Sequence, residues 1–274
     1  MSKSANSVAG TASSKQEDPV QLNRRRFFSA AGGVLALAGL AACTSPQNSA
    51  TAPNPVGDHA PAAAKAPSTP GQALEMLKTG NSRFAEGRPK HPNQTSQLRS
   101  DLAEHQEPWA LVHGCVDSRV APELVFDQGI GDLFVTRTAG AVLDDTLVGS
   151  MEFAVSSPYE VPVIVILGHT ACGAVTGTVE ALEKNAKSPK APGEMIDFIS
   201  EIAPAAREAE PVPDKSEHIN NVVRMNTVAV AAALVERSEI IRAAVNAGRT
   251  EVIAAVYDLQ TGLVDWNLTK NEKI

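Results

Sequence analysis

Two separate stretches of the chain end in side chains that can bind a metal ion. Cys115 follows the apolar residues 110–112, and His169 and Cys172 follow the apolar run 161–167. Two thiolates and one imidazole are typical of a catalytic zinc site, which has three protein ligands and an open fourth position. Taken alone, a cysteine after a strand is most often a small core residue. The two stretches together favour one zinc ion held by these three residues.

Asp117 and Arg119 stand at alternate positions after Cys115. Residues two apart in an extended segment face the same side, so the three side chains can project together. An arginine that binds Asp117 through two nitrogens would keep it ionised and fix its direction, and Asp117 could then accept a proton from a metal-bound water. The alternative is an ordinary surface ion pair that contributes almost nothing. With a zinc set nearby, we interpret Asp117 and Arg119 as the catalytic pair.

The apolar runs before these residues indicate the fold class. Both are short, rich in β-branched residues and bounded by turn signals, which is typical of strands buried on both faces of a parallel sheet. Open sheets of this kind bind ligands at the carboxyl ends of their strands. We therefore predict an α/β fold with a central, mostly parallel sheet flanked by helices. Further strands are expected at 132–137, 251–257 and 263–268, and helices at 72–85, 97–105, 122–126, 147–156, 174–182, 194–209, 220–235 and 238–247.

The N-terminal part has the pattern of a targeting segment. A twin-arginine pattern at residues 24–28 precedes an apolar run that is too short and too rich in Ala and Gly to span a membrane, and this run ends at Cys43 in a sequence resembling a bacterial lipobox. We predict a signal peptide at 1–42, twin-arginine export, a lipidated Cys43 and a periplasmic, membrane-anchored protein. A plain signal peptide or an uncleaved helix is the alternative. Residues 43–70 are predicted to be a disordered tether, and 71–274 the catalytic domain.

Composition limits the partners of this domain. The formal net charge is −7 and aromatic residues make up 4% of the chain, which argues against a nucleic-acid-binding surface. The chain has three cysteines. This low, odd number provides no disulfide framework.

The combined motifs resemble the β-class carbonic anhydrases. The resemblance lies in the Cys-x-Asp-x-Arg motif at 115–119, the GDLFVTR sequence at 131–137 and the Gly-His-x-x-Cys-Gly motif at 168–173, and it extends from Ala73 to the C-terminus. It implies one Zn²⁺ per subunit and reversible hydration of carbon dioxide to bicarbonate and a proton by attack of a zinc-bound hydroxide. Asp117 and Arg119 would orient this hydroxide. A homodimer or homotetramer is also implied.

The same resemblance assigns a substrate pocket. It implies that the amide of Gln106 donates to a substrate oxygen, that Phe134, Ala139 and Phe153 line an apolar pocket for carbon dioxide, and that Gly173 belongs to the substrate site. We interpret His113, two residues before Cys115, as a strand-end residue and not as a ligand.

The chain also departs from the family pattern. Thr138 and Ala141 replace two asparagines that are common after Arg137, so the hydrogen bonding around the pocket should differ. A regulatory bicarbonate site known in one subgroup uses Trp, Arg and Tyr, where this chain has Val112, Arg137 and Phe153. We therefore expect no such regulation and a site in which Asp117 stays off the metal. A hydrolase for carbonyl sulfide or carbon disulfide, and a non-catalytic lipoprotein scaffold, remain the alternative functions.

Overall fold

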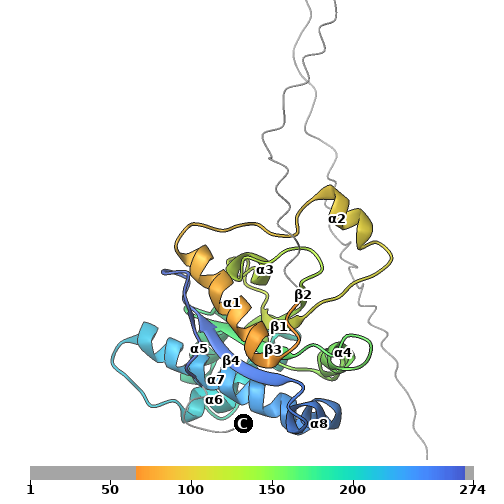
Figure 1. The fold of residues 1–274 in the computed structure, drawn as a ribbon. Coiled ribbons are helices and arrows are strands. Elements are labelled where there is room, and N and C mark those ends of the chain that lie inside the picture. Colours follow the sequence, from red (N-terminus) through yellow and green to blue (C-terminus); the bar gives the residue numbers. More distant parts are fainter. Residues whose placement is uncertain (1–65, 269–274) are drawn as a thin grey trace, which may run out of the picture. The chain divides into compact units, whose positions relative to one another are not determined.

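A computed structural model describes residues 66–268 of the chain as one sheet with helices on its two faces (Figure 1). The strand order is β2-β1-β3-β4-β5, in which the first four strands are parallel and β5 is antiparallel to β4. The predicted mostly parallel sheet is thus confirmed. The strands are β1 (Ala110–Cys115), β2 (Leu133–Thr138), β3 (Val163–His169), β4 (Glu251–Tyr257) and β5 (Val264–Asp265).

Each helix that the sequence predicted is present. The helices are α1 (Pro70–Ala85), α2 (Ser96–Asp101), α3 (Pro122–Val125), α4 (Asp145–Val155), α5 (Gly173–Lys184), α6 (Met195–Glu208), α7 (Lys215–Arg237) and α8 (Glu239–Asn246), with a short 3₁₀ turn, η1 (Ala139–Ala141). Pro204 lies inside α6 without dividing it. The predicted signal peptide and Cys43 lie outside the described residues. Pro70, the last residue assigned to the tether, is already part of α1.

Side-chain caps explain why two helices begin earlier than their apolar patterns indicated. The hydroxyl of Thr69 accepts a hydrogen bond from the Gln72 amide at the start of α1. The carboxylate of Asp214 does the same for the Glu217 amide at the start of α7. Such caps satisfy amide groups that the helix itself leaves unpaired, so polar residues before the apolar stripe become helical.

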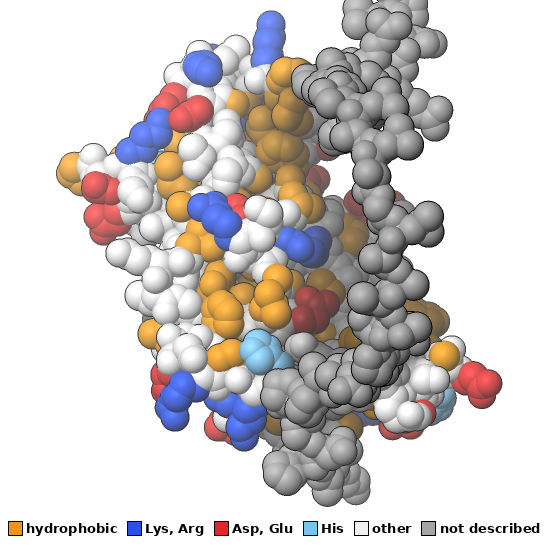
Figure 2. Space-filling view, turned by 90° about the horizontal axis from the view of Figure 1, so that it is seen from above, with side chains coloured by type: hydrophobic (Ala, Val, Ile, Leu, Met, Phe, Trp, Pro, Cys, Tyr) orange, Lys and Arg blue, Asp and Glu red, His pale blue; other side chains and the backbone are white. Residues whose placement is uncertain are grey.

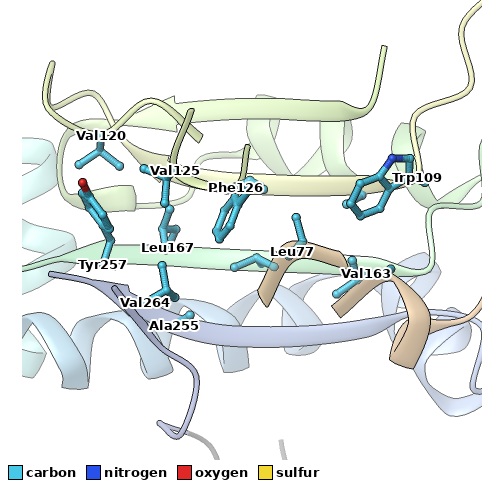
Figure 3. Packing of buried hydrophobic residues seen from close by; sticks show 14 residues of the cluster. Leu77, Trp109, Val120, Val125, Phe126, Val163, Leu167, Ala255, Tyr257 and Val264 are labelled. Carbon is cyan, nitrogen blue, oxygen red and sulfur yellow. The ribbon is translucent and has the colours of Figure 1, made fainter. Parts of the chain in front are cut away.

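Successive residues of the central strands point into two different cores. In β3, Val163, Val165 and Leu167 pack on the side of α1 and α3, whereas Ile164 and Ile166 pack on the opposite side with α4, α7 and α8. Figure 3 shows the first of these cores, with Leu77 of α1 facing Phe126 and Leu167. Burial of β1 and β3 on both faces explains their almost continuous apolar sequences.

A third core lies at the carboxyl ends of the central strands, where α5, α6 and α7 pack together. It contains Cys115 and Cys172, surrounded by apolar residues such as Ile202, Val222 and Val223. These three helices therefore enclose the region in which the strands deliver the predicted metal ligands.

The surface of residues 66–268 retains exposed apolar side chains. Val116 and Phe153 are 55% and 56% exposed, respectively. Figure 2 shows hydrophobic side chains gathered between Lys, Arg, Asp and Glu side chains on the face seen from above. None of the helices in this part of the chain is both long enough and apolar enough to cross a bilayer.

Candidate metal centre

The three predicted ligands come together at the carboxyl end of the sheet. Cys115 is the last residue of β1, His169 is the last residue of the neighbouring strand β3, and Cys172 is the N-cap of α5. One ligand atom from each of them lies within 4.8 Å of the others, and all three side chains are buried. The Sγ atoms of the two cysteines are 3.9 Å apart. The adjacency of β1 and β3 thus joins two motifs that are more than fifty residues apart.

The imidazole of His169 is oriented for metal binding. Its Nδ1 lies 3.0 Å from the carbonyl oxygen of Thr170, and a carbonyl can only accept, so Nδ1 carries the proton and donates it. The Nε2 atom therefore keeps its lone pair. This atom is buried and has no hydrogen-bond partner among residues 66–268. A buried nitrogen without a partner destabilises a fold unless something else satisfies it, and a metal ion at this position would do so.

A small internal cavity of about 10 Å³ lies among the ligand atoms. It has room for a single atom or ion. Gly168 lines this cavity. Close packing requires a glycine at this position, because a Cβ atom there would lie 2.2 Å from Oγ1 of Thr227 on α7. Two sulfurs, one nitrogen and a cavity of this size fit zinc. The cavity is lined by Cys115, Gly140, Ala141, Gly168, His169, Cys172, Val175, Val223, Asn226 and Thr227.

The two cysteines share one proton. The hydrogen bond from Cys172 and, to a smaller extent, the nearby His169 lower the pKa of the Cys115 thiol to about 4, against the effect of burial. The same hydrogen bond, together with burial, raises the pKa of Cys172. The pair therefore favours one thiolate and one thiol. Binding of a cation by both sulfurs would displace the Cys172 proton, so metal binding should release protons.

Asp117 and Arg119 form a bidentate pair beside the ligands. Arg119 donates from Nε to Oδ1 at 2.9 Å and from Nη2 to Oδ2 at 2.7 Å, and its backbone amide also donates to Oδ1 at 2.9 Å. These hydrogen bonds hold the pKa of the Asp117 carboxyl well below its usual range. Oδ2 of Asp117 lies 3.8 Å from Nε2 of His169. The ionised carboxylate is therefore directed at the nitrogen that would bind the metal.

Arg137 fixes the backbone that carries these groups. Its Nε donates to the carbonyl oxygen of Cys115 at 2.7 Å, and its Nη2 donates to that of Asp117 at 2.6 Å. The guanidinium thereby holds the segment that carries the predicted ligand Cys115 and the carboxylate of Asp117. The sequence carried no signal for this role, because it depends on the register in which Arg137 of β2 lies opposite Gly114 of β1.

Comparisons with known proteins give the family. The model of a family described as "Carbonic anhydrase" matches residues 110–264. The chain belongs to the β-carbonic anhydrase family. A carbonic anhydrase from Mycolicibacterium smegmatis is 40% identical over 204 residues, which cover 72% of this chain and 93% of the relative. Carbonic anhydrase 2 from Mycobacterium tuberculosis is 38% identical over 194 residues, covering 70% and 90%.

Solved structures confirm the β-carbonic anhydrase fold. A β-carbonic anhydrase from Coccomyxa, solved with acetazolamide, is 26% identical and has a TM-score of 0.55 over 70% of this chain and 83% of its own. A tetrameric β-carbonic anhydrase from Sordaria macrospora has the same TM-score at 22% identity, with coverages of 70% and 95%. The predicted family and fold are therefore both confirmed.

The residues predicted to bind substrate in this β-carbonic anhydrase fall into two groups. Ala139 is in η1, which follows β2 directly, and Gly173 follows the ligand Cys172. Gln106, Phe134 and Phe153 lie together around Tyr159 instead. The amide of Gln106 donates to the Tyr159 hydroxyl at 3.3 Å. The ring centroids of Phe134, Phe153 and Tyr159 are 5.0–6.2 Å apart.

One chain does not bring this second group to the metal centre. Phe134 pairs with Leu111, whereas Thr138 pairs with the ligand Cys115. Four residues of strand correspond to about 13 Å, so Phe134 lies well away from Cys115 along the sheet. The sequence-based prediction of a single pocket does not hold within one chain. The role of Gln106, Phe134 and Phe153 in substrate binding stays a prediction.

The sequence suggested that His113 is a strand-end residue. In the structure it lies within β1 and has no exposed surface. Its two ring nitrogens contact Oγ1 of Thr136 at 3.0 Å and the carbonyl oxygen of Val142 at 3.2 Å. Both ring nitrogens thus have hydrogen-bond partners within the fold.

Proposed function

We propose that the chain is a zinc-dependent enzyme that reversibly hydrates carbon dioxide to bicarbonate and a proton. The observation that carries this proposal is the buried, unpartnered Nε2 of His169, which faces two cysteines in an ion-sized cavity with an ionised carboxylate 3.8 Å away. The relatives named carbonic anhydrase support the choice of substrate.

Zinc held by Cys115, His169 and Cys172 would supply a nucleophile, since it lowers the pKa of water towards about 7. The chain contributes the orientation of that nucleophile. Oδ2 of Asp117 is the carboxylate oxygen close to His169, and we assign to it the acceptance of a hydrogen bond from the attacking water. Arg119 keeps Asp117 ionised, so Asp117 can only accept and aligns a lone pair of the water with the substrate.

We propose that Asp117 acts beside the metal and not as a fourth ligand. Both of its carboxylate oxygens accept hydrogen bonds from Arg119, and Arg119 also donates to the carbonyl of Ala171 at 3.4 Å. A carboxylate that moved onto the metal would have to give up part of this pairing. Val112 and Phe153 supply no polar groups for a regulatory bicarbonate.

We further propose that a second copy of the chain completes the substrate site. The predicted substrate residues form two groups that one chain keeps apart, and each group has an exposed apolar side chain nearby. These side chains are Val116, next to Asp117, and Phe153. Burial of both in a homodimer or homotetramer would bring Gln106 and Phe134 of one copy towards the ligands of the other. The test is sedimentation: a monomer with full activity would rule this out.

The location of the protein is a separate proposal that rests on residues outside the described part. We propose export by the twin-arginine route and anchoring through a lipid on Cys43, because the twin-arginine pattern, the apolar run and the lipobox occur in the order that this requires. Cells grown with a labelled fatty acid should incorporate the label into the protein. The substitution Cys43→Ser should abolish the label, and a labelled Cys43→Ser protein would contradict the lipid anchor.

The alternative functions are separated by one comparison. Protein of known zinc content is assayed for carbon dioxide hydration by stopped flow with a pH indicator, and for sulfide release from carbonyl sulfide. Hydration that increases in proportion to bound zinc supports the proposed function. Zinc at one equivalent with sulfide release and no hydration would favour the sulfur-gas hydrolase. No bound zinc and no activity in either assay would favour a scaffold.

A further inference from the structure

The imidazole of His113 is fully buried in β1, two residues before the predicted ligand Cys115, and the proposed reaction does not use it. Its Nε2 lies 3.2 Å from the carbonyl oxygen of Val142, which can only accept, so Nε2 carries a proton and donates it. Its Nδ1 lies 3.0 Å from Oγ1 of Thr136, whose hydroxyl can donate to it. The ring therefore connects β1 to the segment that follows β2.

That segment is a tight turn with an unfavourable backbone. Gly140 and Ala141 are both in the left-handed region, with φ of 71° and 56°. The left-handed conformation is unfavourable for alanine, because its Cβ atom crowds the following carbonyl oxygen. It persists only where the surrounding structure holds it.

Three side chains from different elements hold this turn. The carbonyl of Val142 accepts from His113 of β1 and from Oγ1 of Thr138, the latter at 2.7 Å. The carbonyl of Gly140 accepts from Nδ2 of Asn226 of α7 at 3.0 Å. The turn is therefore fixed on both sides of Ala141.

This turn also contacts the predicted metal ligand Cys115. The amide of Gly140 donates to Sγ of Cys115 at 3.3 Å. A hydrogen bond from an amide withdraws electron density from a thiolate and fixes its direction, so it changes what the sulfur donates to a metal. A change in the path of the turn would move this amide away from Cys115.

We infer that His113 is a positioning residue for the metal centre: through the Val142 carbonyl it holds the turn whose Gly140 amide donates to the Cys115 thiolate. This inference rests on the proposed metal centre. The competing interpretation is a histidine whose hydrogen bonds stabilise the core and have no effect on the metal.

The test uses protein in which Co²⁺ replaces zinc, because the sulfur-to-cobalt charge-transfer band reports the electron density on the thiolates. The variant His113→Phe has a ring of similar size without a donor. It should shift the band to longer wavelength, since a thiolate without its hydrogen bond donates more strongly. Zinc affinity, measured by chelator competition, should fall about 10-fold or more, as for other outer-shell partners of metal ligands. His113→Gln can still donate to Val142 and should restore both readouts towards wild type.

The outcomes separate the two interpretations. A lower melting temperature in His113→Phe with an unshifted band and wild-type zinc affinity would show that His113 acts on the core alone. If His113→Phe does not fold, Thr138→Val decides, because it removes the other donor to the same carbonyl: a shift to longer wavelength supports the inference, and an unshifted band overturns it. Absence of a thiolate band in the wild-type protein would contradict the metal centre itself. A normal band without hydration would contradict only the proposed reaction.

Discussion

Oδ2 of Asp117 lies 3.8 Å from Nε2 of His169, the buried nitrogen without a hydrogen-bond partner. One of these atoms belongs to the loop after β1 and the other to the end of β3, so the parallel pairing of the two strands creates their proximity. Arg119 keeps the carboxylate ionised and Arg137 fixes the backbone beneath it.

Removal of Arg119 should change how the protein responds to acid. The Arg119 guanidinium depresses the pKa of Asp117 in the folded chain below its unfolded value of about 3.9. This contribution to stability is therefore complete above about pH 4 and is lost as the pH falls through the folded-state pKa. In Arg119→Gln the folded pKa rises towards the unfolded one, so less stability remains to be lost.

The measurement is urea unfolding of zinc-free protein at about pH 6 and about pH 3.5. The difference in unfolding free energy between the two pH values should be smaller in Arg119→Gln than in the wild type. Arg249→Gln is the matched control, because it removes an exposed pair with Glu160 at 3.5 Å and should leave the difference unchanged. An equal pH response in wild type and Arg119→Gln would contradict the assigned pairing.

Loss of the Arg137 guanidinium should weaken metal binding without unfolding the chain. In Arg137→Met the carbonyls of Cys115 and Asp117 lose their donors, so the ligand segment is less well ordered. Zinc affinity should fall about 10- to 100-fold, and chelator competition measures this. Arg137→Lys should give an intermediate affinity, since an ammonium can reach one carbonyl. Arg224→Met, which removes an exposed ion pair with Asp265, is the surface control. Unchanged zinc affinity in Arg137→Met would show that the hydrogen bonds of Arg137 to the Cys115 and Asp117 carbonyls have no role at the metal.

The packing of α7 on the ligand strand depends on the absence of a side chain at position 168. A Cβ in Gly168→Ala would lie 2.2 Å from Oγ1 of Thr227, so α7 must shift or Thr227 must change rotamer. We expect a loss of about 1–3 kcal/mol in unfolding free energy. The matched control is Gly177→Ala in α5, where nothing lies within 4 Å and helix propensity should give a gain of about 1 kcal/mol. Equal melting temperatures for the two variants would contradict this account of Gly168.

The sequence predicted that Cys115, His169 and Cys172 come together, because each follows a strand whose composition is unambiguous. Apolar, β-branched runs end at Cys115 and just before His169, and parallel sheets gather their carboxyl ends at one edge. The last long strand, Glu251–Tyr257, was predicted with its observed bounds for the same reason. Local composition was sufficient to predict a strand and the residues at its carboxyl end.

Other features depend on contacts that local sequence does not contain. The expected strand over 263–268 pairs only at Val264 and Asp265, because Trp266 packs on Phe126 instead of extending the sheet. The helix expected over 97–105 ends at Asp101. The roles of His113 and Arg137 require the register between β1 and β2. Separation of the predicted substrate residues likewise follows from this register and not from any motif.

The most direct test of the account compares wild type with Asp117→Asn in parallel measurements of zinc content and carbon dioxide hydration. The amide keeps the size of the carboxylate but loses its charge, and its NH₂ group can donate a hydrogen bond where the carboxylate only accepts. Zinc should remain at one per chain in both proteins, because Cys115, His169 and Cys172 are untouched. Hydration should fall about 100-fold or more in the variant, as expected for a lost proton-accepting group. A zinc-loaded Asp117→Asn protein that hydrates carbon dioxide at the wild-type rate would contradict the central claim.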